Sequence, residues 1–346
     1  MECPKCHYER KPGDKECPRC GVIYEKWEKH IIHKKEEEIH TKESATPEYS
    51  VKKDSFGLGE KILKYKYHLA GIIMIIIIGY FFVRTFSFTP AKETHIVKQE
   101  AGVSDKYSKE KTAATEMLKG IQEDYMTLSR LATDEDGLPQ LIKEEIDTTP
   151  KTNGEFGEME RFMRTYMNDM ISQRNDYLLE LDAIGWQRIL DPERIKQDRN
   201  LLESQEMIQR AKDIVEKYRS QIFIFIDNTR EDISNLNLSE NLKQAMIAGF
   251  DKGLEESRPQ VEMLWDMEAQ IASEFENIFR LLAAEEGSWI VENNQILFKN
   301  ESDLNTFNSY MFGIQELITK QGAIQNQSVE IMNNKINNAL NEIRSY

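Results

Sequence analysis

Four cysteines near the start of the chain are the residues whose types and spacing could do chemistry. They are Cys3, Cys6, Cys17 and Cys20, and the chain of 346 residues contains no others. Each CxxC pair forms a tight turn, and two such pairs can place four thiolates around one tetrahedral ion at about 2.3 Å. The spacing therefore predicts one structural zinc ion held by these four side chains.

The first 24 residues resemble the short zinc ribbons, in which two zinc knuckles are carried on small hairpins. Pro4 and Pro18 stiffen the two turns, and Gly21 permits close backbone approach after the second pair. His7 stands where the second pair has Gly21, which leaves all four thiols in place. The resemblance covers residues 1–24 alone and implies a fold in which zinc replaces a hydrophobic core.

Two other uses of the cysteines compete with zinc. A rubredoxin-like iron site uses similar knuckles, but the ten-residue gap leaves little chain for a sheet that would shield a redox metal. Two disulfides are the second alternative. Nucleic acid is not expected as a partner, because residues 1–24 carry five Lys or Arg against four Asp or Glu.

A second stretch, Leu69–Val83, has fifteen residues without a charge. With its flanks the run extends over residues 65–88, where Lys66 and Arg84 can reach outward to the interfaces. Its ten Leu, Ile, Phe and Val residues contribute roughly −3 to −6 kcal/mol toward insertion. A buried helix of a soluble core is the alternative, but the run is apolar all round between polar neighbours. We expect one transmembrane helix, a signal anchor in contact with lipid.

The orientation of this helix follows from charge and from the cysteines. Five lysines precede it, against three cations in the similar window beyond it, and metal-binding thiols last best in a reducing compartment. The N-terminus is therefore expected in the cytoplasm, with a charged linker over residues 25–64. A second linker, residues 89–103, leads to a domain of residues 104–346 that is periplasmic or extracellular. The expected location is a bacterial inner or cytoplasmic membrane.

Three histidines lie in the cytoplasmic linker, at His30, His33 and His40. On a helix they would share roughly one side, which leaves a transition-metal site as one interpretation. A solvated, charged helix is the favoured interpretation of this segment.

Residues 104–346 show helical periodicity over most of their length. Apolar residues recur at spacings of three and four from Phe156 to Ile184, broken at Gln173 and Arg174. Asp191-Pro192 is typical of a helix start, and a heptad-like stripe follows as far as Ile233.

Two further helices complete the pattern. One starts near Ser239, is interrupted by Pro259 and resumes as far as Leu282, and the last runs from about Asp303 toward Ile343. The predicted fold class is therefore mainly α, an antiparallel helical bundle that follows the zinc ribbon and the transmembrane helix.

One segment of the outer domain, residues 288–299, predicts a β-hairpin. Asn293 and Asn294 tolerate the left-handed conformation of a two-residue turn. The expected cross-strand pairs are Trp289 with Phe298 and Val291 with Ile296. The favoured interpretation is a hairpin packed on the core. The alternative is a recognition surface, with Trp289 and Phe298 as partner-binding residues.

The residue types missing from the outer domain exclude several functions. After His95 the chain has no His and no Cys, which excludes a His-containing Ser triad, a Cys nucleophile and a His-ligated metal or haem there. Residues 69–346 carry 47 acidic residues against 30 basic ones, which makes nucleic acid an unlikely partner.

These observations predict a membrane interaction protein rather than an enzyme. The zinc ribbon would lie in the cytoplasm, and the outer bundle would bind an unknown protein partner or a ligand. The first alternative is a transmembrane sensor or transducer that signals by homodimerisation. The second is an envelope enzyme with an acidic active site.

Overall fold

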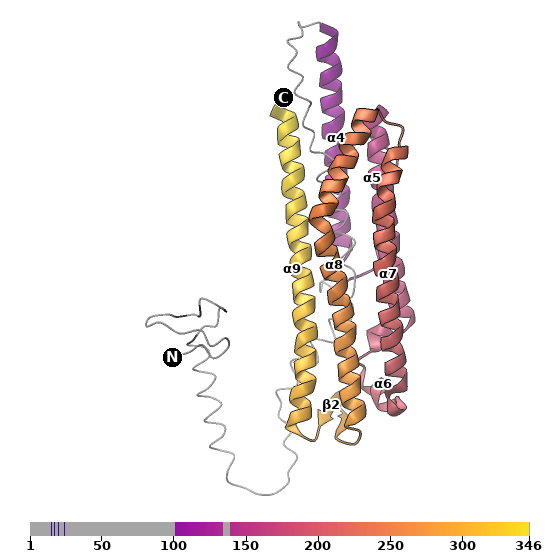
Figure 1. The fold of residues 1–346 in the computed structure, drawn as a ribbon, viewed down its shortest axis with the longest axis vertical. Helices are drawn as coiled ribbons and strands as arrows, with labels where there is room; N and C mark the ends of the chain where they lie inside the picture. Colours follow the sequence, from indigo (N-terminus) through magenta and orange to yellow (C-terminus); the bar gives the residue numbers. More distant parts are fainter. Residues whose placement is uncertain are drawn as a thin grey trace. The chain divides into compact units, whose positions relative to one another are not determined.

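The computed structural model describes residues 15, 17, 20, 24, 101–133 and 139–345, and of residues 101–107 the backbone alone (Figure 1). The chain divides into two compact units, residues 1–52 and 53–346. Cys3, Cys6, the predicted linker 25–64, the predicted span 65–88 and residues 89–100 of the second linker lie outside the described residues. In the part of the chain that the structure describes, no helix has the length and apolar character to cross a membrane.

Five long helices make the second unit mainly α-helical, as predicted. They are α4 (Ala101–Leu131), α5 (Gly154–Ala183), α7 (Leu202–Asn235), α8 (Glu240–Ala284) and α9 (Glu301–Ser345). Each contributes buried apolar side chains to one core, including Tyr125, Met163, Ile222, Leu264 and Ile314. The apolar stripes of the sequence are therefore the seams of a helical bundle.

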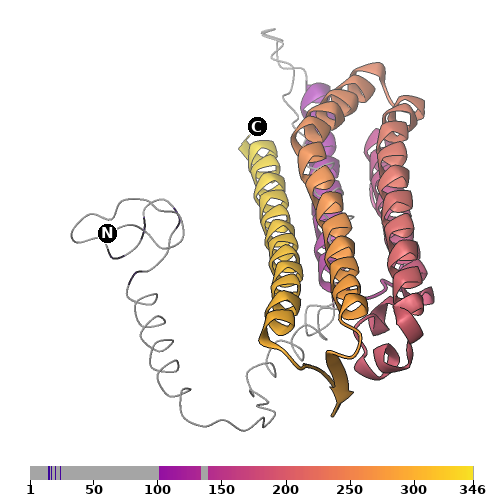
Figure 2. The same cartoon turned by 60° about the horizontal axis from the view of Figure 1, so that its bottom comes forward.

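The five helices contact one another in the order α4, α5, α7, α8, α9 and back to α4. Figure 2 shows α7, α8 and α9 as a row of neighbours. In a closed ring of five helices the neighbours cannot all be antiparallel, because the number of helices is odd. One neighbouring pair must run in the same direction.

That pair is α4 and α5, which corrects the prediction of a wholly antiparallel bundle. Arg164 of α5 contacts Asp124 of α4, and ten residues further along α5 Arg174 contacts the carbonyl of Ala132. The residue number increases in the same direction along both helices, so α4 and α5 are parallel. By contrast, Lys111 lies beside Arg344, so α4 and α9 are antiparallel.

The parallel pair requires a connection that returns along the bundle. Residues 139–153, here called the strap, are extended and run back beside α5. Ile142 bonds to Asn175, Ile146 to Asn168 and Thr152 to Glu160, so the strap is antiparallel to α5. Neither α4 nor the strap was singled out by the helical periodicity.

The second predicted helix is in fact two. Asp191 caps α6 (Pro192–Gln197) as predicted, because its carboxylate accepts from the backbone N–H groups of Glu193 and Arg194. The chain then passes through a 3-10 turn, η4 (Arg199–Leu201), before α7 begins. Asn200 and Leu201 both have a φ of 55°, which breaks the helix.

Pro259 does not interrupt its helix, so the predicted break at this proline is wrong. It lies inside α8, and α8 changes direction part of the way along in Figure 1. Proline removes one helical hydrogen bond and bends a helix. The helix continues because buried residues, among them Phe250 and Val261, hold both sides of the proline in the core.

The hairpin prediction is confirmed. Strands β1 (Trp289–Glu292) and β2 (Gln295–Phe298) are antiparallel, with Trp289 opposite Phe298 and Val291 opposite Ile296. The two turn residues, Asn293 and Asn294, have φ values of 50° and 60°. The hairpin contacts α6 and α9 at the end of the bundle where α9 begins.

Candidate functional site

The strap is held by side chains of α5 that bond to its backbone. Asn175 accepts from the N–H of Ile142 at 3.1 Å and donates to its carbonyl at 2.7 Å. Asn168 makes the same pair of bonds with Ile146, both at 2.9 Å. Each amide side chain thus takes the place of the neighbouring strand that an extended segment has in a sheet.

Charged side chains secure the two ends of the strap. Arg174, which is 1% exposed, donates to the carbonyls of Ala132 at 2.6 Å and Gln140 at 2.7 Å. Burial lowers the pKa of Arg174 to about 10, so the guanidinium remains charged at neutral pH. At the other end one carboxylate oxygen of Glu160 accepts from the N–H groups of Lys151 and Thr152, at 2.9 and 3.0 Å.

Arg164 joins the strap, α4 and α5 at one point. Its guanidinium lies 3.1 Å from Glu160 and 2.9 Å from Asp124, and it donates to the carbonyl of Thr149 at 2.8 Å. The side chains of Arg164 and Glu160 are 2% and 0% exposed, and that of Asp124 is 23% exposed. This is a buried ion pair with a half-buried third member.

Two glycines make room for this cluster. A Cβ added at Gly120 of α4 would lie 3.3 Å from the Arg164 guanidinium. One added at Gly157 of α5 would lie 2.4 Å from the carbonyl oxygen of Thr152. The helix backbones can approach the arginine and the end of the strap because both positions lack side chains.

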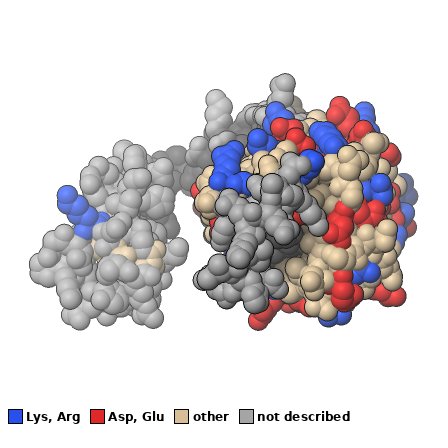
Figure 3. All heavy atoms as spheres, turned by 90° about the horizontal axis from the view of Figure 1, so that it is seen from above, with Lys and Arg blue, Asp and Glu red and all other residues tan. Residues whose placement is uncertain are grey.

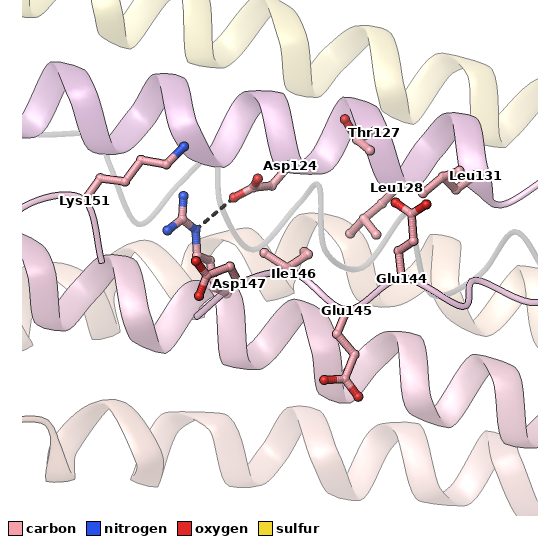
Figure 4. A pocket seen from close by; sticks show the side chains of 10 residues that line it. Asp124, Thr127, Leu128, Leu131, Glu144, Glu145, Ile146, Asp147 and Lys151 are labelled. Carbon is pink, nitrogen blue, oxygen red and sulfur yellow. Dashed lines mark hydrogen bonds and ion pairs between the residues drawn. The ribbon is translucent and has the colours of Figure 1, made fainter. Parts of the chain in front are cut away.

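A pocket of about 210 Å³ lies beside the cluster, between α4 and the strap (Figure 4). Part of its lining is apolar and comes from Leu128, Leu131 and Ile146. The rest of the lining is polar: Asp124, Thr127, Glu144, Glu145, Asp147, Lys151 and Arg164. Figure 4 shows Lys151 extending toward Asp124, with Asp147 close by.

The charges in this pocket are of both signs. A hydrogen bond from the backbone of Thr149 holds the pKa of Asp147 below its usual value, with smaller contributions from Arg164 and Lys151. In the described part of the chain, no group of three or more His, Cys, Asp or Glu side chains could hold a metal ion. The lining thus presents charged and hydrogen-bonding groups together with apolar side chains.

Two of the four predicted zinc ligands lie within the described residues. Cys17 is 1% exposed and Cys20 is half-buried. The N–H of Tyr24 donates to the carbonyl of Lys15 at 3.1 Å. Cys3 and Cys6 lie outside the described residues, so the zinc site stays a prediction.

The two predicted partner-binding residues of the hairpin contact the bundle. Trp289 is half-buried, and its indole N–H donates to the carbonyl of Leu282 at 2.8 Å. The ring of Phe298 lies 5.2 Å from that of Phe307 in α9. On the other face Ile290 is 43% exposed. These contacts agree with the hairpin packed on the core, and a partner-binding role for Trp289 and Phe298 stays a prediction.

The residues that hold the strap and line the pocket were not predicted from the sequence. The sequence pattern singled out none of Glu160, Arg164, Asn168 and Asn175. One signal was present, since Gln173 and Arg174 break the apolar rhythm of α5 and Arg174 is an anchor of the strap. A break in a buried stripe thus marked a buried charge.

The described surface itself is mixed in charge. Figure 3 shows Lys and Arg interspersed with Asp and Glu on the face of the bundle that it displays. Comparisons of the chain with models of protein families, with curated proteins and with solved structures found no match.

Proposed function

We propose that this chain is a single-pass membrane interaction protein. Cys3, Cys6, Cys17 and Cys20 would hold one zinc ion in a cytoplasmic ribbon, and residues 65–88 would cross the membrane. The helical bundle would bind a partner or ligand on the outer side.

The observation that carries this proposal is the division of residue types along the chain. Every cysteine lies on one side of the apolar run, and the bundle on the other side has neither Cys nor His. A ribbon needs reduced thiols, whereas an exported domain without thiols avoids unwanted oxidation. The bundle has its own apolar core, which suits a domain that folds apart from the ribbon.

The pocket beside the strap supports a binding role for the bundle. It combines apolar residues with charged groups that are held in place by hydrogen bonds, as binding sites for small molecules commonly do. Its ligand would be small and polar, given a volume of about 210 Å³.

A transmembrane transducer is the second candidate, and one feature of the pocket favours it. One wall comes from α4, through Asp124, Thr127, Leu128 and Leu131. Of the helices in the bundle, α4 is the first after the predicted span in the sequence. A ligand in the pocket would therefore contact the helix that leads back toward the membrane. A single membrane helix transmits a change poorly, so this mechanism would use homodimerisation.

Metal analysis tests the ribbon. The purified full-length chain should contain one zinc per chain, and Cys17→Ser should lose most of it without changing the helical circular dichroism signal of the bundle. Iron, or no metal under reducing conditions, would remove the zinc ribbon from the proposal.

Protease protection tests the topology. Protease added to intact cells should digest the chain beyond about residue 88 and spare the ribbon. The reverse pattern would overturn the orientation. A ligand-dependent change in cross-linked dimer would then favour the transducer, and a constant oligomeric state would favour the interaction protein.

A further inference from the structure

We propose that residues 143–150, the middle of the strap and here called the gate, open and close over the pocket while both ends of the strap stay in place. The gate would control entry of a ligand to the space between the strap and α4. Its three supports are the weak attachment of the gate, the firm attachment of its flanks and its position in the pocket wall.

The gate buries little of itself. None of its eight residues is fully buried, and five are exposed: Lys143, Glu144, Glu145, Asp147 and Thr149. Among the described residues, three hydrogen bonds join it to α5, two between Asn168 and Ile146 and one from Arg164 to Thr149. Segments with few buried apolar contacts open locally at a lower free energy than the whole domain unfolds.

The residues that flank the gate are buried as well as hydrogen-bonded. On one side Ile142 is 4% exposed and is bonded twice to Asn175. On the other side Thr152 is 5% exposed, and both its N–H and its hydroxyl donate to Glu160. Opening is therefore confined to the segment between these two points.

The gate also forms part of the pocket. Glu144, Glu145, Ile146 and Asp147 line it on the strap side, and Leu128 lines it on the α4 side. Leu128 is 2% exposed in the closed arrangement. When the gate moves away from α4, the side chain at position 128 becomes accessible from solvent.

Thiol labelling measures this opening in the full-length chain. Leu128→Cys places a thiol behind the gate, and its alkylation by iodoacetamide is followed by mass spectrometry of the peptide that contains it. Asn168→Ala, added to this variant, removes two hydrogen bonds of the gate, so alkylation should become about 5- to 150-fold faster. Thr127→Cys provides a second reporter in the same wall if the first variant does not fold.

Two controls separate gate opening from general loosening. Asn228→Ala removes an exposed asparagine of α7 and should leave the labelling rate at position 128 unchanged. Ala211→Cys, at a position that is 1% exposed in the core, should label equally slowly with and without Asn168→Ala. An unchanged rate at position 128 in Asn168→Ala, or an equal increase at position 211, would overturn the gate.

The use of the gate rests on the proposed binding function, but its motion does not. The labelling experiment contains no ligand, so it reports on opening alone. A failed search for a ligand of the pocket would count against the binding function and leave the measured motion standing.

Discussion

Replacing Arg164 should reveal how strongly the buried ion pair holds the strap and α4 to α5. Arg164→Met keeps much of the side-chain length and removes the charge, which leaves the fully buried Glu160 without its guanidinium. Breaking a buried pair in this way costs about 3 to 5 kcal/mol. That is a large part of the roughly 5 to 15 kcal/mol by which a domain is stable.

The structure places the expected cost toward the lower end of that range. Glu160 keeps three hydrogen bonds from Lys151 and Thr152, which continue to stabilise its charge. Asp124 also loses its partner, but its side chain is 23% exposed, so water partly solvates the charge that is left. We therefore expect about 3 kcal/mol.

Urea unfolding of the full-length chain, followed by circular dichroism at the helical band, measures this cost. Arg161→Met is a matched control on the same helix, because Arg161 pairs with Glu158 but is 54% exposed. It should cost about 0 to 1 kcal/mol. Adding Glu160→Gln to Arg164→Met should recover part of the loss, since a neutral amide replaces the stranded charge.

Equal costs for Arg164→Met and Arg161→Met would refute the reasoning. So would a double variant whose cost is the sum of the two single ones, because the two side chains would then not be coupled. Either outcome would mean that Arg164 is solvated in the protein in solution.

Three further predictions concern other parts of the bundle. Trp289→Phe keeps a ring on the hairpin but loses the indole N–H bond to α8, so the free energy of unfolding should fall by about 0.5 to 1.5 kcal/mol in urea titrations. Glu268→Ala removes the buried acceptor of the Gln321 amide at 2.9 Å and should cost at least about 1 to 3 kcal/mol, whereas Glu268→Gln should cost less; equal costs would contradict this. The hydrogen bond from Lys212 lowers the pKa of Glu276 in the folded protein. The stability that this carboxylate contributes is therefore fully present above its unfolded-state pKa of about 4.3 and is lost as the pH falls through the lower folded value. The free energy of unfolding, measured from pH 7 to 3, should decline, and Glu276→Gln should reduce that decline.

The hairpin was predictable because its determinants are local. Asn293 and Asn294 accept a left-handed backbone, and the alternating side chains on either side then fix which residues face each other. The helical stripes were predictable for a similar reason, since one apolar face per helix is written at a short and regular spacing.

The strap was not predictable because its determinants are far apart in the sequence. The amide of Asn175 bonds to Ile142, which lies 33 residues earlier, and nothing in the local pattern of either residue indicates the other. Glu160 and Arg164 likewise occur at a spacing that is common on exposed helix surfaces. Their burial depends on the strap and on α4, which cover them from another part of the chain.

At Pro259 the prediction was wrong because it relied on a local preference alone. Proline disfavours the interior of a helix by about 3 kcal/mol. Fifteen of the 45 residues of α8 are buried, and their tertiary packing outweighs the cost of the proline.

In the proposed topology the two ends of the bundle would lie at different distances from the membrane. Lys111, ten residues into α4, donates to the carbonyl of Arg344, so the end of α9 lies beside the first half of α4. The 45 residues of α9 then extend for about 68 Å to the hairpin. In the proposed topology a label attached to the end of α9 would report on events close to the lipid surface. Ile290 at the hairpin would meet molecules several nanometres farther out, across a spacing comparable to twice the thickness of the hydrocarbon layer.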